Sequence, residues 1–163
     1  MNISVKNVNE ATFRKLKAMS AELQKSMGEA LTEAANEWID KNRKILSGLE
    51  NIVEKAKTDK DVVAVILFGS FARREPTFRD VDVAILLKDG KYDYVKKETD
   101  YWPSDIFDVS ILNRLPLNVA AAVLEGGKIL FVSDWNELED FSIRVVKQWS
   151  DLKPLYRELI SSE

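Results

Sequence analysis

The sequence predicts an α/β (α+β) protein in which a small mixed sheet is flanked by helices and preceded by a separate helical module. Three nearly continuous apolar runs, at residues 61–68, 81–87 and 106–112, are typical of strands in a sheet that is covered on both faces. Elsewhere, apolar residues recur every three or four positions, which is the spacing of amphipathic helices. We therefore expect a module over residues 1–44 and a domain over residues 45–163.

The first module begins with an alternating segment over residues 2–8. Ile3 and Val5 fall on one side of this segment, and Ser4 and Lys6 fall on the other. The alternation predicts a short strand with one apolar face and one polar face.

Two helices are predicted to follow this strand. Asn9 can cap the first, whose apolar positions extend to Leu23 at helical spacing. Ser26 and Glu29, three positions apart, form the pattern of a capping box at the start of the second helix. The second helix continues through Ile39.

The second part of the chain is predicted to combine helices and strands. Besides the three apolar runs, its elements are a helix over residues 45–56, a helix over 117–125, a strand over 128–132 and helical structure over 134–163. Only Ser47–Gly48 interrupts the first of these helices, which can therefore continue the helix before it. Residues 88–105 are polar and aromatic and predict a loop. Pro154 suits the first turn of a new helix, capped by Ser150 or Asp151, better than a helix interior.

Composition limits the chemistry that the chain can perform. Its 163 residues include no cysteine and no histidine. The absence of cysteine excludes disulfides, thiolate metal sites and cysteine nucleophiles. The absence of histidine excludes Ser-His-Asp mechanisms, imidazole zinc sites and histidine general bases. Catalysis would rest on carboxylates, hydroxyls, lysine, arginine or a metal ion that prefers oxygen ligands.

Hydropathy and charge favour a soluble protein. No apolar run approaches the roughly 20 residues of a membrane span, and the N-terminus lacks the pattern of a signal peptide. We therefore expect a cytoplasmic protein without a membrane partner. The net charge of −3 argues against a chain coated by nucleic acid, although not against a local basic patch.

A glycine–serine turn follows the first apolar run. Gly69 lets a ligand approach the backbone because it has no Cβ, and Ser70 adds a hydroxyl. The N–H groups at the start of a helix favour an anion, to which Arg73 or Arg74 can add a positive charge. The turn predicts a phosphate seat, although the same residues taken alone also fit an ordinary turn.

Acidic residues stand in or beside the other two apolar runs. Asp80 and Asp82 begin the second run, and Asp108 interrupts the third. Alternation places the first two carboxylates on one face, roughly 6.6 Å apart along the chain. If the two strands are adjacent, three carboxylates converge, and a divalent cation would relieve their repulsion. Ligands that are all oxygen indicate Mg²⁺ or Mn²⁺. In the alternative interpretation, Asp80 caps its strand and Asp108 faces solvent on an edge.

The segment LFGSFARREPTFRDVDVAIL, at residues 67–86, combines the turn with the first two acids. With the later Asp108, it resembles the signature of the minimal nucleotidyltransferases of the DNA polymerase β-like superfamily. The resemblance extends over residues 62–132. Arg79 departs from the family pattern, in which a serine usually precedes the first aspartate, and this departure concerns a hydroxyl contact rather than the metal site.

This resemblance implies a mechanism. Asp80 and Asp82 would hold two Mg²⁺ ions on a nucleoside triphosphate such as ATP. Asp108 would help to bind one of these ions and to lower the pKa of an attacking hydroxyl. The turn at Gly69–Ser70 and the Arg73 side chain would bind the phosphates. In-line attack on the α-phosphate would transfer a nucleoside monophosphate and release pyrophosphate.

Residues 5–31, VKNVNEATFRKLKAMSAELQKSMGEAL, are similar to antitoxin-type ribbon-helix-helix modules. Such a module is too small to bury a core alone, and the family forms dimers. The resemblance implies a homodimer in which Ser4 and Lys6, with Asn2, enter the DNA major groove. Residues 1–44 contain eight basic and six acidic residues. This excess of positive charge is small for a segment that binds phosphates. The alternative is a module that only dimerises or packs on the catalytic domain.

Stand-alone members of the nucleotidyltransferase family often act as antitoxins. The resemblance therefore implies a HEPN-type toxin as partner, to whose tyrosine the chain would add AMP. Two other functions fit the sequence: a DNA-binding or toxin-binding protein with a non-catalytic scaffold, and a nucleotidyltransferase for a small molecule or RNA. Trp102, which lies beside a proline in the predicted loop, is the one tryptophan suited to base stacking.

Overall fold

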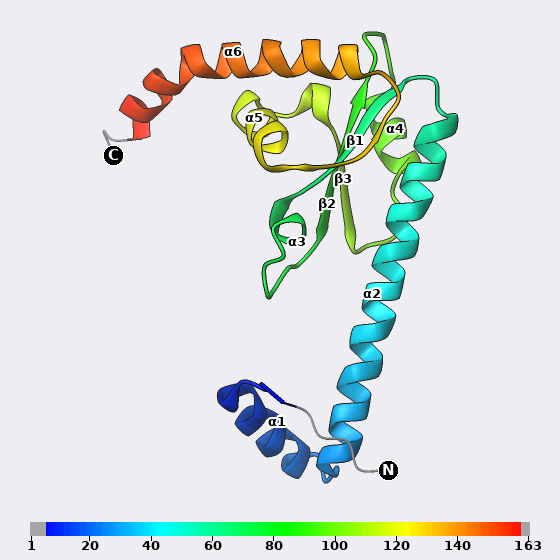
Figure 1. The fold of residues 1–163 in the computed structure, drawn as a ribbon, viewed down its shortest axis with the longest axis vertical. Helices are drawn as coiled ribbons and strands as arrows, with labels where there is room; N and C mark the ends of the chain where they lie inside the picture. Colours follow the sequence, from blue (N-terminus) through cyan, green and yellow to red (C-terminus); the bar gives the residue numbers. More distant parts are fainter. Residues whose placement is uncertain (1–5, 161–163) are drawn as a thin grey trace. The chain divides into compact units, whose positions relative to one another are not determined.

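The computed structural model describes residues 6–160, without the side chains at positions 155 and 157–160. The chain divides into two compact units, Met1–Lys44 and Ile45–Glu163. The boundary falls inside helix α2 (Met27–Thr58), which contributes to both units. Figure 1 shows the elements of each unit.

The first unit contains helix α1 (Glu10–Glu22) and the first part of α2. Asn9 caps α1, because its side chain accepts a hydrogen bond from the Thr12 N–H at 3.1 Å. At the start of α2, the Ser26 N–H donates to the Glu29 carboxylate at 2.8 Å, and the Glu29 N–H donates to the Ser26 hydroxyl at 3.2 Å. The predicted N-cap and the predicted capping box are both confirmed.

The strand predicted over residues 2–8 is only partly within the described residues. Lys6, Asn7 and Val8 are described, and none of them is in a strand. The earlier positions, with Ser4 among them, lie outside the described residues. The ribbon of the ribbon-helix-helix prediction is therefore not confirmed.

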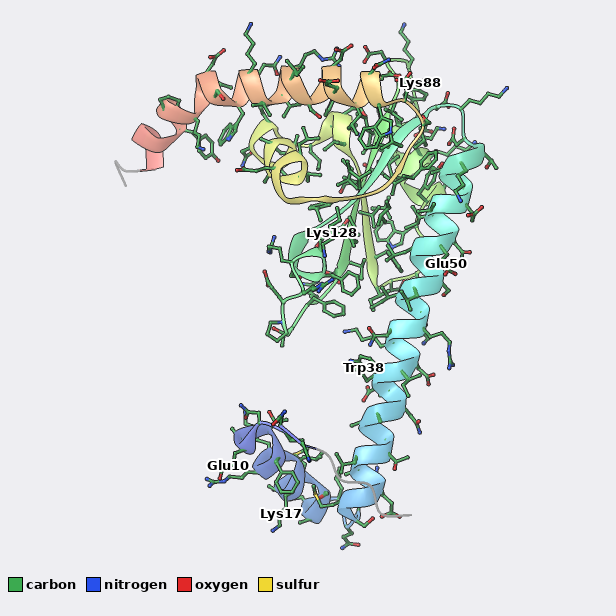
Figure 2. All side chains as sticks on the ribbon, in the orientation of Figure 1. Glu10, Lys17, Trp38, Glu50, Lys88 and Lys128 are labelled. Atoms are coloured by element: carbon green, nitrogen blue, oxygen red, sulfur yellow. The ribbon has the colours of Figure 1, made fainter. Side chains whose placement is uncertain are left out.

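The described part of the first unit, residues 6–44, contains no buried apolar residue. Within residues 6–44, Ser20 is the one buried residue that the structure describes. Leu31 and Trp38 of α2 are 43% and 67% exposed, and Figure 2 labels Trp38 on this helix. These two residues are seven positions apart, so they lie on the same side of α2.

The second unit is built on a four-stranded mixed sheet with the strand order β3-β2-β1-β4. Its strands are β1 (Val62–Phe68), β2 (Val81–Leu87), β3 (Phe107–Ile111) and β4 (Lys128–Val132). β1 pairs antiparallel with β2 and β4, whereas β2 and β3 pair parallel. The predicted fold class is confirmed, and so are the four strands predicted for this unit.

Helices cover both faces of this sheet, as the apolar runs predicted (Figure 1). One face packs against the second part of α2, and the other packs against α5 (Leu117–Gly126) and α6 (Trp135–Ile160). Successive residues of β2, such as Val83 and Ala84, are buried in opposite cores. Two short elements follow β1 and β3, namely the single turn α3 (Gly69–Ala72) and the 3₁₀ helix η1 (Leu112–Arg114).

Helix α2 continues without a break through Ser47 and Gly48, over 32 residues in all. Packing explains the glycine, because a Cβ at Gly48 would collide with the ring of Phe107 in β3. The helix therefore approaches the sheet more closely than any side chain would permit. Although α2 and α6 are long, no helix of the described residues is apolar enough to cross a membrane.

Two predictions for the second unit are wrong. Residues 88–105 are not all loop, because helix α4 (Tyr94–Asp100) forms within them. Asp93 caps this helix by accepting a hydrogen bond from the Lys96 N–H at 3.1 Å. Pro154 does not begin a new helix either, since α6 continues through it at the cost of one backbone hydrogen bond.

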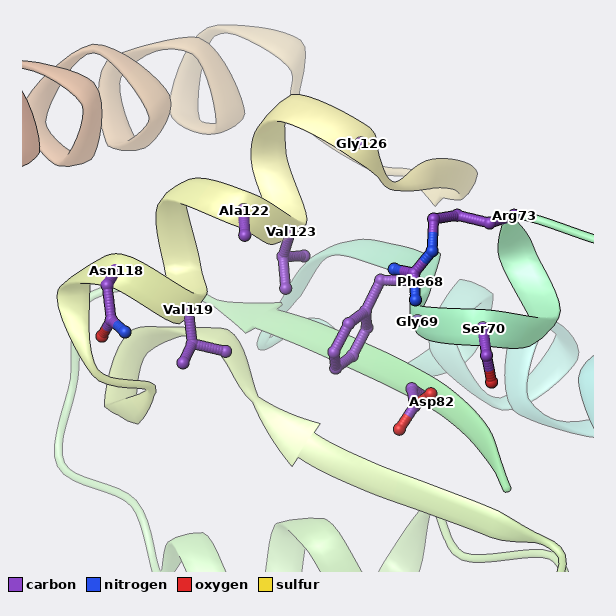
Figure 3. Close-up of a pocket in the computed structure, with 10 residues that line it drawn as sticks. All are labelled: Phe68, Gly69, Ser70, Arg73, Asp82, Asn118, Val119, Ala122, Val123 and Gly126. Carbon is purple, nitrogen blue, oxygen red and sulfur yellow. The ribbon is translucent and has the colours of Figure 1, made fainter. Parts of the chain in front are cut away.

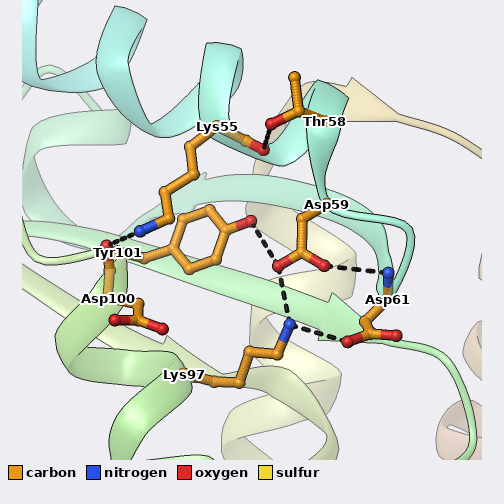
Figure 4. A network of polar contacts seen from close by, with 7 residues as sticks. All are labelled: Lys55, Thr58, Asp59, Asp61, Lys97, Asp100 and Tyr101. Atoms are coloured by element: carbon orange, nitrogen blue, oxygen red, sulfur yellow. Dashed lines mark hydrogen bonds and ion pairs between the residues drawn. The ribbon is translucent and has the colours of Figure 1, made fainter.

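A partly buried polar network ties α4 to the segment that leads into β1 (Figure 4). The Lys97 ammonium donates to the carboxylates of Asp59 at 2.7 Å and Asp61 at 2.9 Å. Asp59 also accepts from the Tyr101 hydroxyl at 3.0 Å. Burial alone would raise the pKa of Asp59, but hydrogen bonds from Lys97, Asp61 and Tyr101 hold this pKa below its ordinary value. Burial would lower the pKa of Lys97, and its two carboxylate partners raise this pKa instead.

We expect Lys97→Met to lower the free energy of unfolding by about 2 kcal/mol, because two carboxylates then face each other without their cation. The stabilisation from Asp59 is present above its unfolded pKa, about 4, and is lost as the pH falls through its lower folded pKa. The stabilisation from Lys97 is present below about pH 10 and is lost as the pH rises through its raised folded pKa. Urea unfolding of both proteins across this range measures the difference. The exposed neighbour Lys96→Met is the control, and a pH-independent difference would contradict the prediction.

Candidate active site

The turn after β1 brings the backbone against the first residues of β2. Phe68, the last residue of β1, is the register partner of Asp82. Gly69 follows with a φ of 72°, in the left-handed region that glycine adopts without strain. A Cβ at Gly69 would collide with the Oδ2 atom of Asp82. Glycine is therefore what allows the turn and this carboxylate to lie so close together.

The residues after Gly69 continue beside the same carboxylate. Gly69–Ala72 form α3, a single helical turn for which Arg73 is the C-cap. The Nε atom of Arg73 donates to Glu75 at 2.7 Å, and both side chains are largely exposed. Ser70 and Arg73 line one cavity together with Asp82. A hydroxyl and a guanidinium thus lie beside the turn, as a phosphate seat requires.

The parallel pairing of β2 and β3 places two of the predicted acids side by side. Asp82 and Asp108 are register partners, so their side chains leave neighbouring strands on the same face of the sheet. The alternative interpretation was correct that Asp108 is exposed on an edge strand. The register nevertheless aligns this residue with Asp82. Asp80 lies just before β2 and is half-buried.

These three carboxylates act on one another electrostatically. Burial raises the pKa of the Asp82 carboxyl, and the negative charges of Asp108 and Asp80 raise it further. The Arg73 guanidinium lowers it, but the net shift is upward. Arg73 therefore offsets only part of the effect of burial and of the two neighbouring carboxylates on Asp82.

The acids share this region without forming a closed cage. In the part of the chain that the structure describes, no group of three or more acidic side chains gathers closely enough to hold a metal ion. Asp80 instead forms an ion pair with Arg79, with 3.4 Å between Nε and Oδ2, and the Arg79 side chain is 94% exposed. An exposed pair of this kind contributes less than about 1 kcal/mol, so a divalent cation can displace it.

The donor set fits a hard divalent cation. Asp80, Asp82 and Asp108 offer only carboxylate oxygens, the ligands that Mg²⁺ and Mn²⁺ prefer. A cation would also relieve the repulsion that raises the pKa of Asp82.

A cavity of about 530 Å³ opens between the turn and α5. This volume is within the usual range for small-molecule sites. Figure 3 shows the turn and Asp82 at one end of the cavity and the first turn of α5 at the other. Its lining residues are Phe68, Gly69, Ser70, Arg73, Asp82, Asn118, Val119, Ala122, Val123 and Gly126.

The structure brings together some of the predicted residues and separates others. Gly69, Ser70, Arg73 and Asp82 line the cavity, and Asp108 is aligned with Asp82. Trp102, the candidate for base stacking, lines a different cavity of about 160 Å³ beside Lys55 and Tyr101. The predicted DNA contact Lys6 belongs to the first unit, and Ser4 lies outside the described residues.

Sequence reasoning missed the wall that α5 provides. Five of its residues line the cavity, namely Asn118, Val119, Ala122, Val123 and Gly126. The helix itself was predicted, but nothing in a lone sequence indicates which side of a helix faces a ligand. The available signal was one carboxamide in the first turn of a helix whose next six residues are all apolar.

A glycine turn beside carboxylates from two adjacent strands is the arrangement that the sequence motif predicts for a nucleotidyltransferase. Residues 50–136 match the family model described as polymerase beta, nucleotidyltransferase. This match spans more than half of the chain, and the chain belongs to this family. It is thus a nucleotidyltransferase by family, as the sequence motif indicated.

The fold is similar to that of chains from solved toxin–antitoxin complexes. One is the tri-AMPylated HEPN toxin of Shewanella oneidensis with the MNT antitoxin (TM-score 0.54, 16% identity, covering 73% of this chain and 97% of that one). A second is a toxin–antitoxin with AMP-PNP (TM-score 0.51, 18% identity, covering 74% of this chain and 95% of that one). A third is the toxin–antitoxin pair MntA–HepT (TM-score 0.52, 19% identity, covering 70% of this chain and 95% of that one). At these identities the similarity concerns the fold alone. No curated protein matches the chain.

Proposed function

We propose that the chain transfers a nucleoside monophosphate, AMP from ATP, to a hydroxyl acceptor in a reaction that depends on Mg²⁺ or Mn²⁺. The observation that carries this proposal is the β2–β3 register, which aligns Asp82 with Asp108 opposite the Gly69 turn. Family membership and the cavity beside the turn support it.

The chain's own residues have separate roles in the proposed reaction. Ser70 and Arg73 hold the triphosphate beside the turn, and the acids are the ligands of the metal. A metal held by these acids would neutralise phosphate charge and lower the pKa of the acceptor hydroxyl. The acceptor oxygen forms a bond to the α-phosphorus, and the bond to pyrophosphate breaks. Asp108, exposed at the sheet edge, takes the acceptor's proton.

The test is incubation of the purified chain with ATP labelled on the α-phosphate, with and without Mg²⁺ and candidate acceptor proteins. We expect label on the acceptor and release of pyrophosphate only when the metal is present. Transfer without added metal, or no transfer to any acceptor, would contradict the proposal. The second result is the one that a non-catalytic scaffold predicts.

We further propose that the acceptor is a tyrosine hydroxyl of a HEPN-type toxin. The support is that the fold resembles chains of toxin–antitoxin complexes, one of which contains an AMPylated HEPN toxin. Co-expression with the neighbouring reading frame, followed by mass spectrometry of the partner, tests this. A partner that is unmodified while small molecules or RNA become labelled would favour the other acceptors.

The first unit is proposed to form a homodimer. In support of a dimer, no apolar residue is buried over the described positions 6–44. A unit this small needs a partner surface to bury its apolar side chains. Contact of Ser4 and Lys6 with DNA is a separate proposal. A gel shift with the chain's own upstream DNA at low salt tests it, and the absence of a shift would remove it.

We expect Trp38→Lys to convert the homodimer into a monomer, because the charge would be buried in the interface. Light scattering at several protein concentrations measures the mass. Glu37→Lys, one position away and also exposed, places a lysine outside the apolar side, with an even larger change in charge, and should leave the dimer intact. A monomeric wild-type chain would overturn the homodimer proposal.

A further inference from the structure

The far end of the active-site cavity differs chemically from its phosphate end. Apolar groups of Phe68, Val119, Ala122 and Val123 occupy its middle (Figure 3). Beyond them, in the first turn of α5, lies the side chain of Asn118. A flat apolar group bound here would therefore meet one carboxamide at its edge.

Among the described residues, the carboxamide of Asn118 has no hydrogen-bond partner, either for its oxygen or for its nitrogen. Asn113, five positions earlier, shows the contrast. Its oxygen accepts from the Leu87 N–H and its nitrogen donates to the Leu87 carbonyl, both at 2.9 Å, so it extends the pairing of β2. Asn113 is thus structural, whereas Asn118 is half-buried and open to the cavity.

We propose that Asn118 selects the base of the nucleotide and favours adenine. The inference rests on the proposed function, which places the triphosphate at the Gly69 end and leaves the base to the apolar middle. A carboxamide has one donor group and one acceptor, and it pairs with the N7 and N6 positions of adenine. At the same edge guanine offers two acceptors, N7 and O6, so the carboxamide cannot form both hydrogen bonds with it.

The test compares ATP and GTP with the wild type and with Asn118→Leu, which keeps the approximate side-chain volume but removes both hydrogen-bonding groups. Equilibrium dissociation constants in Mg²⁺ are measured alongside kcat and KM for transfer. We expect the wild type to prefer ATP by roughly tenfold, in line with the 1–3 kcal/mol of a bidentate contact. In Asn118→Leu the ratio of the GTP dissociation constant to the ATP dissociation constant should fall to about one. The cause should be weaker binding of ATP, with kcat unchanged.

Two controls separate the possible outcomes. Asn118→Gln keeps the carboxamide and should retain part of the preference, whereas Asn136→Leu, exposed on α6, should retain all of it. An unchanged ATP preference in Asn118→Leu overturns the inference, as does a wild type that binds both nucleotides equally. If the wild type prefers ATP in binding but transfers nothing, the proposed function fails while the role of Asn118 is still decided by the dissociation constants.

Discussion

Asp82→Asn is expected to reduce nucleotide transfer by about 10³-fold while leaving the fold intact. Asp82 is the one acid that both lines the cavity and is aligned with a second acid on the neighbouring strand. An asparagine keeps the shape but removes the charge that would hold the metal, and the loss of one preorganised group of this kind costs on the order of 10²–10³ in rate. Initial rates with labelled ATP measure the effect, and Asp80→Asn should behave in the same direction.

The same substitution is expected to raise stability without metal. Burial and the charges of Asp108 and Asp80 raise the pKa of Asp82, so its ionised form destabilises the folded chain. For an acid with a raised folded pKa, stability rises as the pH falls through that pKa, and Asp82→Asn should therefore gain most at neutral pH and least in acid. Thermal unfolding from mild acid to neutral pH measures this gain.

A matched control separates the local repulsion from a change in net charge. Asp105→Asn removes an exposed carboxylate shortly before β3 and should change neither transfer nor melting temperature. Adding Mg²⁺ should stabilise the wild type and Asp105→Asn but not Asp82→Asn, since a ligand stabilises only the state that binds it. Undiminished turnover in Asp82→Asn would remove the metal-binding role of this residue.

The sheet and the acids could be predicted from the sequence because their signals are local. A buried strand needs apolar side chains on both faces, so the run from Val81 to Leu87 identifies β2 within its own seven residues. An acid inside such a run is costly without a partner, and Asp82 and Asp108 therefore stand out. Their alignment was conditional on strand adjacency, which only the register of the folded sheet decides.

The parts that were mispredicted depend on contacts between distant segments. Helix α4 is short and polar, and Lys97 on it is held by Asp59 and Asp61, more than thirty positions earlier in the chain. The α5 wall was invisible for the same reason, because its role depends on where the Gly69 turn lies. Pro154 is an exception: it is exposed, and among the described residues no contact between distant segments explains why α6 continues through it.

Gly69→Ala is expected to reduce both stability and activity. A residue with a Cβ pays about 1–2 kcal/mol for the left-handed conformation at this position. The added methyl group would also collide with the Asp82 carboxylate, so either the turn or the acid must move. A displacement of about 1 Å in a catalytic group costs on the order of 10²-fold in rate. We therefore expect transfer to fall at least 10²-fold even at temperatures where the variant is fully folded.

Gly126→Ala is the matched control for this substitution. Gly126 lines the same cavity, but a Cβ there would meet nothing within 4 Å and its φ is not positive. Circular dichroism should show both variants folded at low temperature, with a lower melting temperature for Gly69→Ala alone. If Gly69→Ala transferred nucleotide at the wild-type rate, the close approach of the turn to Asp82 would have no part in catalysis. Equal losses in both variants would instead indicate that cavity volume, rather than this contact, limits the reaction.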